Sequence, residues 1–253
     1  MTMDDRSNLE PPTDDRVTSA TAREASSPET LKQLWLETGV VLALAVVPDF
    51  CSACRSLAWP SINAPAFADD RLAFCTRSFQ VSVPVLYLIW RSSQPWSAFG
   101  LSRPRWLVDA LEGLALWMVG IVATTQIWWL FKALLSPRAF DMMAATVEQP
   151  MEPPHGGDYV LLLIDCVMNG FAEELVMRGY LIPRFERLLR STWGSLLLTT
   201  ALFAAYHCYQ GPAGVIEAAT FGLVYGAAFC MFRRVWPLAL AHAMANFISY
   251  FGQ

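Results

Sequence analysis

Ionisable side chains set inside long apolar segments are the feature that most constrains this chain. Between its polar stretches the sequence consists of apolar runs of about 20 residues, the length with which an α-helix crosses the hydrocarbon core of a bilayer. Apolar residues make up 55% of the chain and charged residues only 16%, against about 25% charged in a typical soluble domain. The sequence therefore predicts an all-α, polytopic membrane protein.

Seven segments are predicted to span the membrane. They cover approximately residues 34–54, 72–90, 107–135, 158–184, 193–209, 213–232 and 235–251. With the amino terminus in the cytoplasm, the cytoplasmic segments hold 13 Lys and Arg residues and the outer segments hold four. Because Lys and Arg concentrate on the cytoplasmic side of membrane proteins, this asymmetry predicts a cytoplasmic amino terminus. We expect a multi-pass integral membrane protein, in the plasma or inner membrane if the source is bacterial.

Residues 1–33 differ in composition from the rest of the chain. They hold seven acidic and four basic residues, are rich in Ser, Thr and Pro, and lack aromatics. Such a segment cannot bury enough apolar surface to order itself, so we expect a disordered tail before a transmembrane domain at 34–253. The net charge of −4 and the absence of a basic stripe give no reason to expect a nucleic-acid partner.

The six cysteines do not indicate a paired zinc site. Cys51 and Cys54 form a single Cys-x-x-Cys pair, and a second pair is missing. The others lie in or beside apolar runs, where packing is the simplest role. The sequence leaves open the roles of Cys51 and Cys54, and of three further ionisable residues inside apolar segments: Arg77, Asp165 and Glu217.

Four polar residues on three predicted spans fall at similar depths. At about 1.5 Å of rise per residue, His242 lies roughly 10 Å from the cytoplasmic side, Glu173 and Asn246 roughly 16 Å, and His207 roughly 21 Å. The chain has only three histidines, and two of them are in this set. Ionisable groups in hydrocarbon are costly and usually functional, so these four residues form a candidate site.

The residue types suit water attack on an amide. A carboxylate near a histidine can hold and deprotonate a water molecule, which fits Glu173 and His207. His242 and Asn246 are four residues apart on one helix face and can donate hydrogen bonds to a developing oxyanion. Two histidines and a carboxylate also suit Zn²⁺, so Glu173, His207 and His242 are the alternative metal ligands. The structural alternative is a helix ion pair between Glu174 and Arg178 and hydrogen-bonded packing histidines.

Three motifs in this order resemble those of the CPBP family, the Abi and CAAX protease-like group that includes the type II CAAX prenyl endopeptidases. The motifs are Glu173-Glu174-x-x-x-Arg178, Phe203-x-x-x-His207 and His242-x-x-x-Asn246. The resemblance covers about residues 158–250, which we expect to be the catalytic core.

The resemblance implies an intramembrane protease and a role for each matching residue. Glu173 and His207 match the positions that activate water, and His242 and Asn246 match those assigned to the oxyanion. Glu174 and Arg178 match supporting positions; from its place one turn before Glu173, Asn169 is expected to orient that residue. Both a metalloprotease and a metal-free glutamate mechanism are associated with the family. We favour the glutamate mechanism without cofactor, with zinc as the alternative.

The expected substrate is a membrane protein or a lipidated peptide, cleaved within the bilayer. Two other functions would use the same residues differently. A proton-coupled transporter could use Glu173 and His207 as a proton relay. A non-catalytic membrane scaffold or immunity factor would be indifferent to substitution of Glu173.

Overall fold

The computed structural model describes residues 30–59, 65–147 and 154–250. In these ranges all regular secondary structure is helical, with no strand, so the all-α prediction is confirmed there. The first helix begins at Leu31, two residues before the expected end of the polar tail. The rest of that tail lies outside the described residues, and its disorder stays a prediction.

Within the described residues, each of the seven predicted spans overlaps a helix or a helical stretch. The elements in chain order are α2 (Leu31–Val41), η1 (Leu42–Val46), α3 (Val47–Ala58), α4 (Phe67–Arg91), η2 (Trp96–Phe99), α5 (Trp106–Leu134), α6 (Pro137–Met143), α7 (Asp158–Glu174), η3 (Leu175–Leu181), α8 (Ile182–Leu189), α9 (Thr192–Tyr206), η4 (Cys208–Gln210), α10 (Gly211–Phe232) and α11 (Trp236–Ser249).

Four helical stretches of the described chain are long and apolar enough to cross a membrane. They are Leu31–Ala58, Phe67–Arg91, Trp106–Leu134 and Cys208–Phe232. Helices α9 and α11 have only 15 and 14 residues, fewer than the roughly 20 that a straight crossing needs. An integral membrane protein is thus supported, whereas the count of seven spans and their orientation stay predictions.

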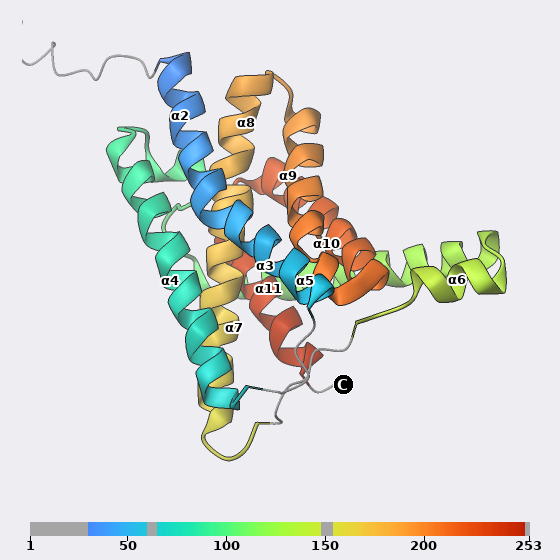
Figure 1. Ribbon diagram of the computed structural model, residues 1–253. Helices are drawn as coiled ribbons and strands as arrows, with labels where there is room; N and C mark the ends of the chain where they lie inside the picture. The colour runs from blue at the N-terminus through green and yellow to red at the C-terminus, as the bar shows by residue number, and fades with distance from the viewer. Residues whose placement is uncertain (1–29, 60–64, 148–153, 251–253) are drawn as a thin grey trace, which may run out of the picture. The chain divides into compact units, whose positions relative to one another are not determined.

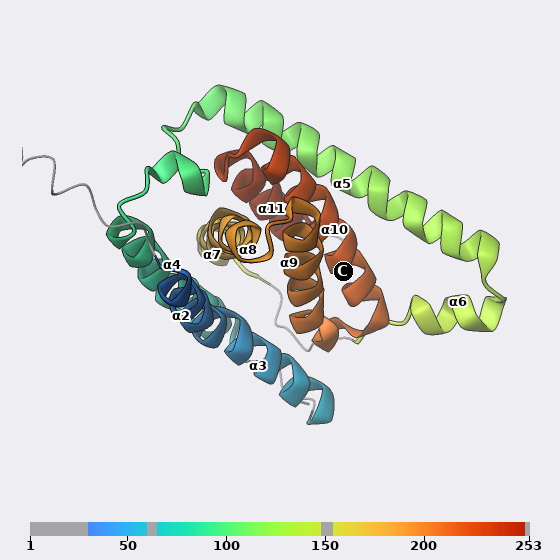
Figure 2. The ribbon, with the colours of Figure 1, turned by 90° about the horizontal axis from the view of Figure 1, so that it is seen from above.

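Helix α7 is the element around which the site is built. It packs against α4 on one side and α11 on the other, and Figure 1 shows α4 and α7 side by side. Helices α9 and α10 pack together, and α5 runs along α10 and α11, as Figure 2 shows. Large apolar side chains of α5, including Leu107, Leu111 and Trp129, are exposed, as expected of a helix that faces lipid.

Gly170 permits the close approach of α7 and α11. A Cβ atom at this position would lie 2.8 Å from the backbone nitrogen of Ala243 and 3.0 Å from the carbonyl oxygen of Ala239. Both are backbone atoms, so they could not move aside without shifting α11. Because Gly170 is one turn before Glu174, and Ala243 follows His242, this contact sets the spacing of the candidate site.

Two π-helical segments interrupt the long helices, each followed by a proline. Pro48 lies two residues after the end of η1, and Pro183 lies two residues after the end of η3. A proline has no N–H for the carbonyl four residues earlier, so the helix preceding it readily widens. Segments of this kind often occur at functional sites, and η3 begins directly after Glu174.

A buried ion pair joins α4 to α7, two turns before Glu173. Arg71 donates from Nη1 to Oδ2 of Asp165 at 2.8 Å, and both side chains are almost fully buried. Arg71 also donates to Asp70 and to the hydroxyl of Tyr250, just after α11. Asp165, whose role the sequence leaves open, thus serves to fix α4 and α7 together.

We predict that Gly170→Ala destabilises the protein, whereas Gly39→Ala does not. The new methyl group at position 170 must push against α11, which should cost about 1–3 kcal/mol. A Cβ atom at Gly39 in α2 would meet no other atom within 4 Å, so alanine there should be neutral or stabilise by up to about 1 kcal/mol. Thermal unfolding of both variants in detergent would measure the difference; equal midpoints would contradict the packing role of Gly170.

Candidate active site

Glu174 is the fully buried centre of the candidate site. Its Oε1 accepts hydrogen bonds from Nη1 of Arg178 at 2.9 Å and from Nδ1 of His242 at 2.8 Å. An ionised carboxylate can only accept, so Nδ1 of His242 carries the proton in this contact. Glu174 therefore fixes the orientation of the His242 ring and links α7 to α11. The expected pair between Glu174 and Arg178 is present, but it is buried rather than on a water-facing surface.

Arg178 completes this buried support. Its side chain is 2% exposed, and its guanidinium lies over the ring of Phe203 at 4.6 Å from the centroid. The hydrogen bond to Glu174 and the contact with the ring of Phe203 keep the positive charge of Arg178 beside Glu174 and away from solvent. Because a buried charge is tolerated only when paired, Glu174 and Arg178 depend on each other.

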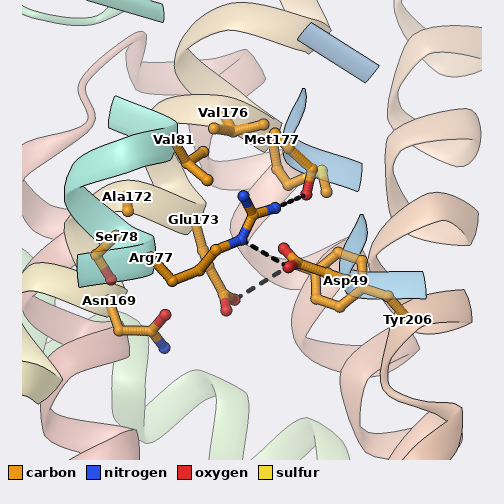
Figure 3. Close-up of a pocket in the computed structure, with 11 residues that line it drawn as sticks. Asp49, Arg77, Ser78, Val81, Asn169, Ala172, Glu173, Val176, Met177 and Tyr206 are labelled. Carbon is orange, nitrogen blue, oxygen red and sulfur yellow. Dashed lines mark hydrogen bonds and ion pairs between the residues drawn. The ribbon is translucent and has the colours of Figure 1, made fainter. Parts of the chain in front are cut away.

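Glu173 has a different environment from its neighbour Glu174. Its side chain is 22% exposed, and it lines a pocket formed by η1, α3, α4, α7, η3 and Tyr206 (Figure 3). Its Oε2 accepts a hydrogen bond from the hydroxyl of Tyr206 at 3.3 Å and lies 3.6 Å from Nε2 of His242. Adjacent glutamates thus divide into one that is accessible from the pocket and one that is buried.

His207 directly follows Tyr206, the residue whose hydroxyl contacts Glu173. Its Nδ1 is 2.8 Å from the carbonyl oxygen of Phe203, and a carbonyl only accepts, so Nδ1 carries the proton in this bond. Nε2 is then the basic nitrogen of the neutral ring. The ring packs against that of Tyr206, with 4.7 Å between centroids.

The two asparagines of the candidate site, Asn169 and Asn246, differ in where they lie relative to Glu173 and Glu174. Asn169 lines the same pocket as Glu173, one turn earlier on α7 (Figure 3). Asn246 is half-buried one turn after His242 on α11. In the described ranges, no hydrogen bond joins the side chain of Asn246 to Glu173 or Glu174. The structure thus joins four of the expected residues by contacts of 3.6 Å or less, namely Glu173, Glu174, Arg178 and His242, and places Asn169 in the same pocket as Glu173.

Three residues of the pocket were not assigned to the site from the sequence. Tyr206 donates to Glu173, and its place next to His207 was the available signal. Arg77 and Asp49 line the pocket from α4 and α3 and form an ion pair of 2.8 Å. Arg77 was recognisable as an arginine inside an apolar segment, but nothing in the sequence pairs it with Asp49.

Glu217 and the two cysteines of the Cys-x-x-Cys pair, whose roles the sequence leaves open, lie outside the pocket. Glu217 is exposed on α10 and accepts a hydrogen bond from Nε1 of Trp128 on α5 at 3.2 Å. Cys51 and Cys54 are exposed free thiols on α3. Neither Glu217 nor Cys51 lines the pocket of Glu173.

The grouping of possible metal ligands in the described residues bears on the zinc alternative. Throughout ranges 30–59, 65–147 and 154–250, no three or more His, Cys, Asp or Glu residues are grouped so that they could hold a metal ion. The nitrogen Nδ1 of His242 is occupied by Glu174, and Nδ1 of His207 by a backbone carbonyl. These contacts leave Nε2 of each ring as the nitrogen that a metal would bind, so the zinc alternative with Glu173, His207 and His242 stays a prediction.

Comparison with known families agrees with the motifs. Residues 155–248, from just before α7 almost to the end of α11, match the family described as type II CAAX prenyl endopeptidase Rce1-like. The match contains every catalytic and supporting residue expected from the sequence and leaves out α2 to α6. No curated protein and no solved structure matches the chain.

We predict that Glu174→Gln lowers the stability of the folded protein much more than Glu173→Gln. The first substitution leaves the buried Arg178 without its carboxylate, which should cost about 3 kcal/mol or more. The second removes charge from a half-buried group that faces the pocket. Thermal unfolding of the two variants in the same detergent is the measurement. A smaller effect for Glu174→Gln would show that Glu174 is not the structural member of the pair.

Proposed function

We propose that the protein is an intramembrane endopeptidase, because residues 155–248 belong to the type II CAAX prenyl endopeptidase Rce1-like family. It would hydrolyse a peptide bond in a membrane-associated or lipidated protein. The observation that carries this proposal is the position of Glu173, a pocket-lining carboxylate 3.6 Å from the imidazole of His242, backed by the buried pair of Glu174 and Arg178.

Glu173 is proposed as the general base. A water molecule in the pocket donates a proton to this carboxylate, attacks the scissile carbonyl carbon, and the proton passes to the leaving amine. Tyr206 supports this role because its hydroxyl donates to Oε2 of Glu173 and restricts the carboxylate. His207, packed on Tyr206, assists through its unprotonated Nε2, which can accept a hydrogen bond from the same water and orient it.

His242 and Asn246 are proposed as donors to the oxyanion. With Nδ1 of His242 donating to Glu174, the ring donates from Nε2 as an imidazolium, whose charge is balanced by Glu173 and Glu174. The amide of Asn246 provides a second donor one turn further along α11. These two roles agree with the burial of the two glutamates. Glu174 is buried and orients His242, whereas Glu173 is accessible and can contact water.

We predict that Glu173→Gln and His207→Ala each lower cleavage about 100-fold while the protein stays folded, because the first removes the general base and the second removes a group that orients the water. The matched control is Glu217→Gln, which changes a carboxylate on α10 outside the pocket. Proteomics of membrane fractions from wild type and the Glu173→Gln strain would identify an uncleaved precursor. Full cleavage by both variants would refute the proposal. In a separate uptake assay, substrate accumulation in proteoliposomes without proteolysis would favour a transporter.

We also predict that cleavage survives thorough chelation. The proposed mechanism uses only side chains, so the rate of purified protein should change less than about twofold in excess chelator. Elemental analysis of the purified protein accompanies the assay. A loss of activity that Zn²⁺ restores would instead favour the metal alternative with Glu173, His207 and His242 as ligands.

A further inference from the structure

Arg77 brings a cation into the pocket of Glu173 from a part of the chain that the family match leaves out. It lies on α4, and its side chain is 30% exposed. Figure 3 shows its guanidinium above the carboxylate of Glu173, with Asp49 and Tyr206 on the opposite wall. An arginine inside an apolar helix is costly and usually serves a function.

Two contacts hold the guanidinium and leave part of it available. Nε donates to Oδ1 of Asp49 at 2.8 Å, and Nη2 donates to the carbonyl oxygen of Ala45 in the π-helical segment η1 at 3.0 Å. Among the described residues, none accepts a hydrogen bond from Nη1 of Arg77. A guanidinium has five N–H donors, so it retains donors that can face the pocket.

The charges favour a neutral acceptor for these donors. Asp49 already balances Arg77, and Glu173 adds a further negative charge to the pocket lining. A third carboxylate entering the pocket would be repelled by both Asp49 and Glu173. A peptide carbonyl carries no net charge and accepts such a hydrogen bond without that repulsion.

Peptide hydrolysis in a membrane creates a need for such donors. In an intact helix each carbonyl already accepts a bond from the N–H four residues later. A segment unwound for cleavage loses these bonds, and lipid offers no replacement, so the protein must supply partners. Asn169 and Ser78 line the same pocket as Arg77 and carry polar side chains on adjacent helices, α7 and α4.

We propose that Arg77 is a substrate-binding residue that donates to a main-chain carbonyl of an extended substrate segment lying across Glu173. Asp49 positions the guanidinium of Arg77 by accepting a hydrogen bond from its Nε. The substrate is then a chain end or an unwound stretch of membrane-associated polypeptide, and not an intact helix. This inference rests on the proposed endopeptidase function, and it adds α3 and α4 to the site.

The test measures binding separately from cleavage. The probe is a fluorescent ten-residue peptide with a farnesylated cysteine, titrated in detergent micelles into protein that carries Glu173→Gln. Adding Arg77→Gln should weaken binding about tenfold, the value of one hydrogen bond to a charged group. Arg77→Lys should weaken it less. The matched control is Arg233→Gln, which changes an arginine paired with Glu186 outside the pocket.

A second arm tests the substrate class. The same peptide, locked as a helix by a hydrocarbon link between side chains four residues apart, should bind at least about tenfold more weakly than the free peptide, because its carbonyls are already paired. Thermal unfolding of each variant checks the fold. If Arg77→Gln is unstable, Arg77→Lys decides the result, since it keeps the charge but loses the planar donor arrangement.

The outcomes separate this inference from the proposed function. Unchanged binding by folded Arg77 variants, equal binding of the locked helix, or no binding of the free peptide would each overturn the inference. Cleavage of the free peptide by protein with Glu173 intact, combined with unchanged binding in Arg77 variants, would overturn the inference alone. Binding that depends on Arg77, without any cleavage by the intact protein, would support the inference and count against the endopeptidase function.

Discussion

The hydrogen bonds to Glu174 are the interaction on which the rest of the site depends. The fully buried carboxylate of Glu174 accepts hydrogen bonds from Arg178, one turn later in the chain, and from His242 on α11. In a low-dielectric interior these groups stabilise each other strongly but are costly when unpaired. The arrangement therefore requires α7 and α11 to approach closely, and Gly170 provides that approach by lacking a side chain.

Adjacent glutamates acquire different chemistry from this geometry. Successive residues of an α-helix point about 100° apart, so Glu174 can face α11 while Glu173 faces the pocket. The first is a fixed acceptor that orients an imidazole, and the second is a carboxylate that water can reach. Arg178, four residues after Glu174, lies in the π-helical segment that begins directly afterwards and pairs with Glu174.

The pocket itself is assembled from both halves of the chain. Helices α7 and α9 contribute Glu173 and Tyr206, whereas α3 and α4 contribute Asp49 and Arg77. The family match covers only the first of these contributions. The amino-terminal helices therefore close one side of the site and supply the cation that lines it, in addition to adding apolar surface for the membrane.

The sequence by itself determined the helical class and the positions of the helices, and it named most of the residues that meet in the candidate site, because apolar segment length and ionisable residues within such segments are local properties. It did not decide how many segments cross the membrane, since α9 and α11 are short and the stretch from α7 to α8 carries several charged residues. Only the tertiary structure distinguished buried Glu174 from accessible Glu173, and paired Arg71 with Asp165 and Arg77 with Asp49. Those pairs join residues that are distant in the chain, so their partners depend on how the helices pack and not on any spacing within the sequence.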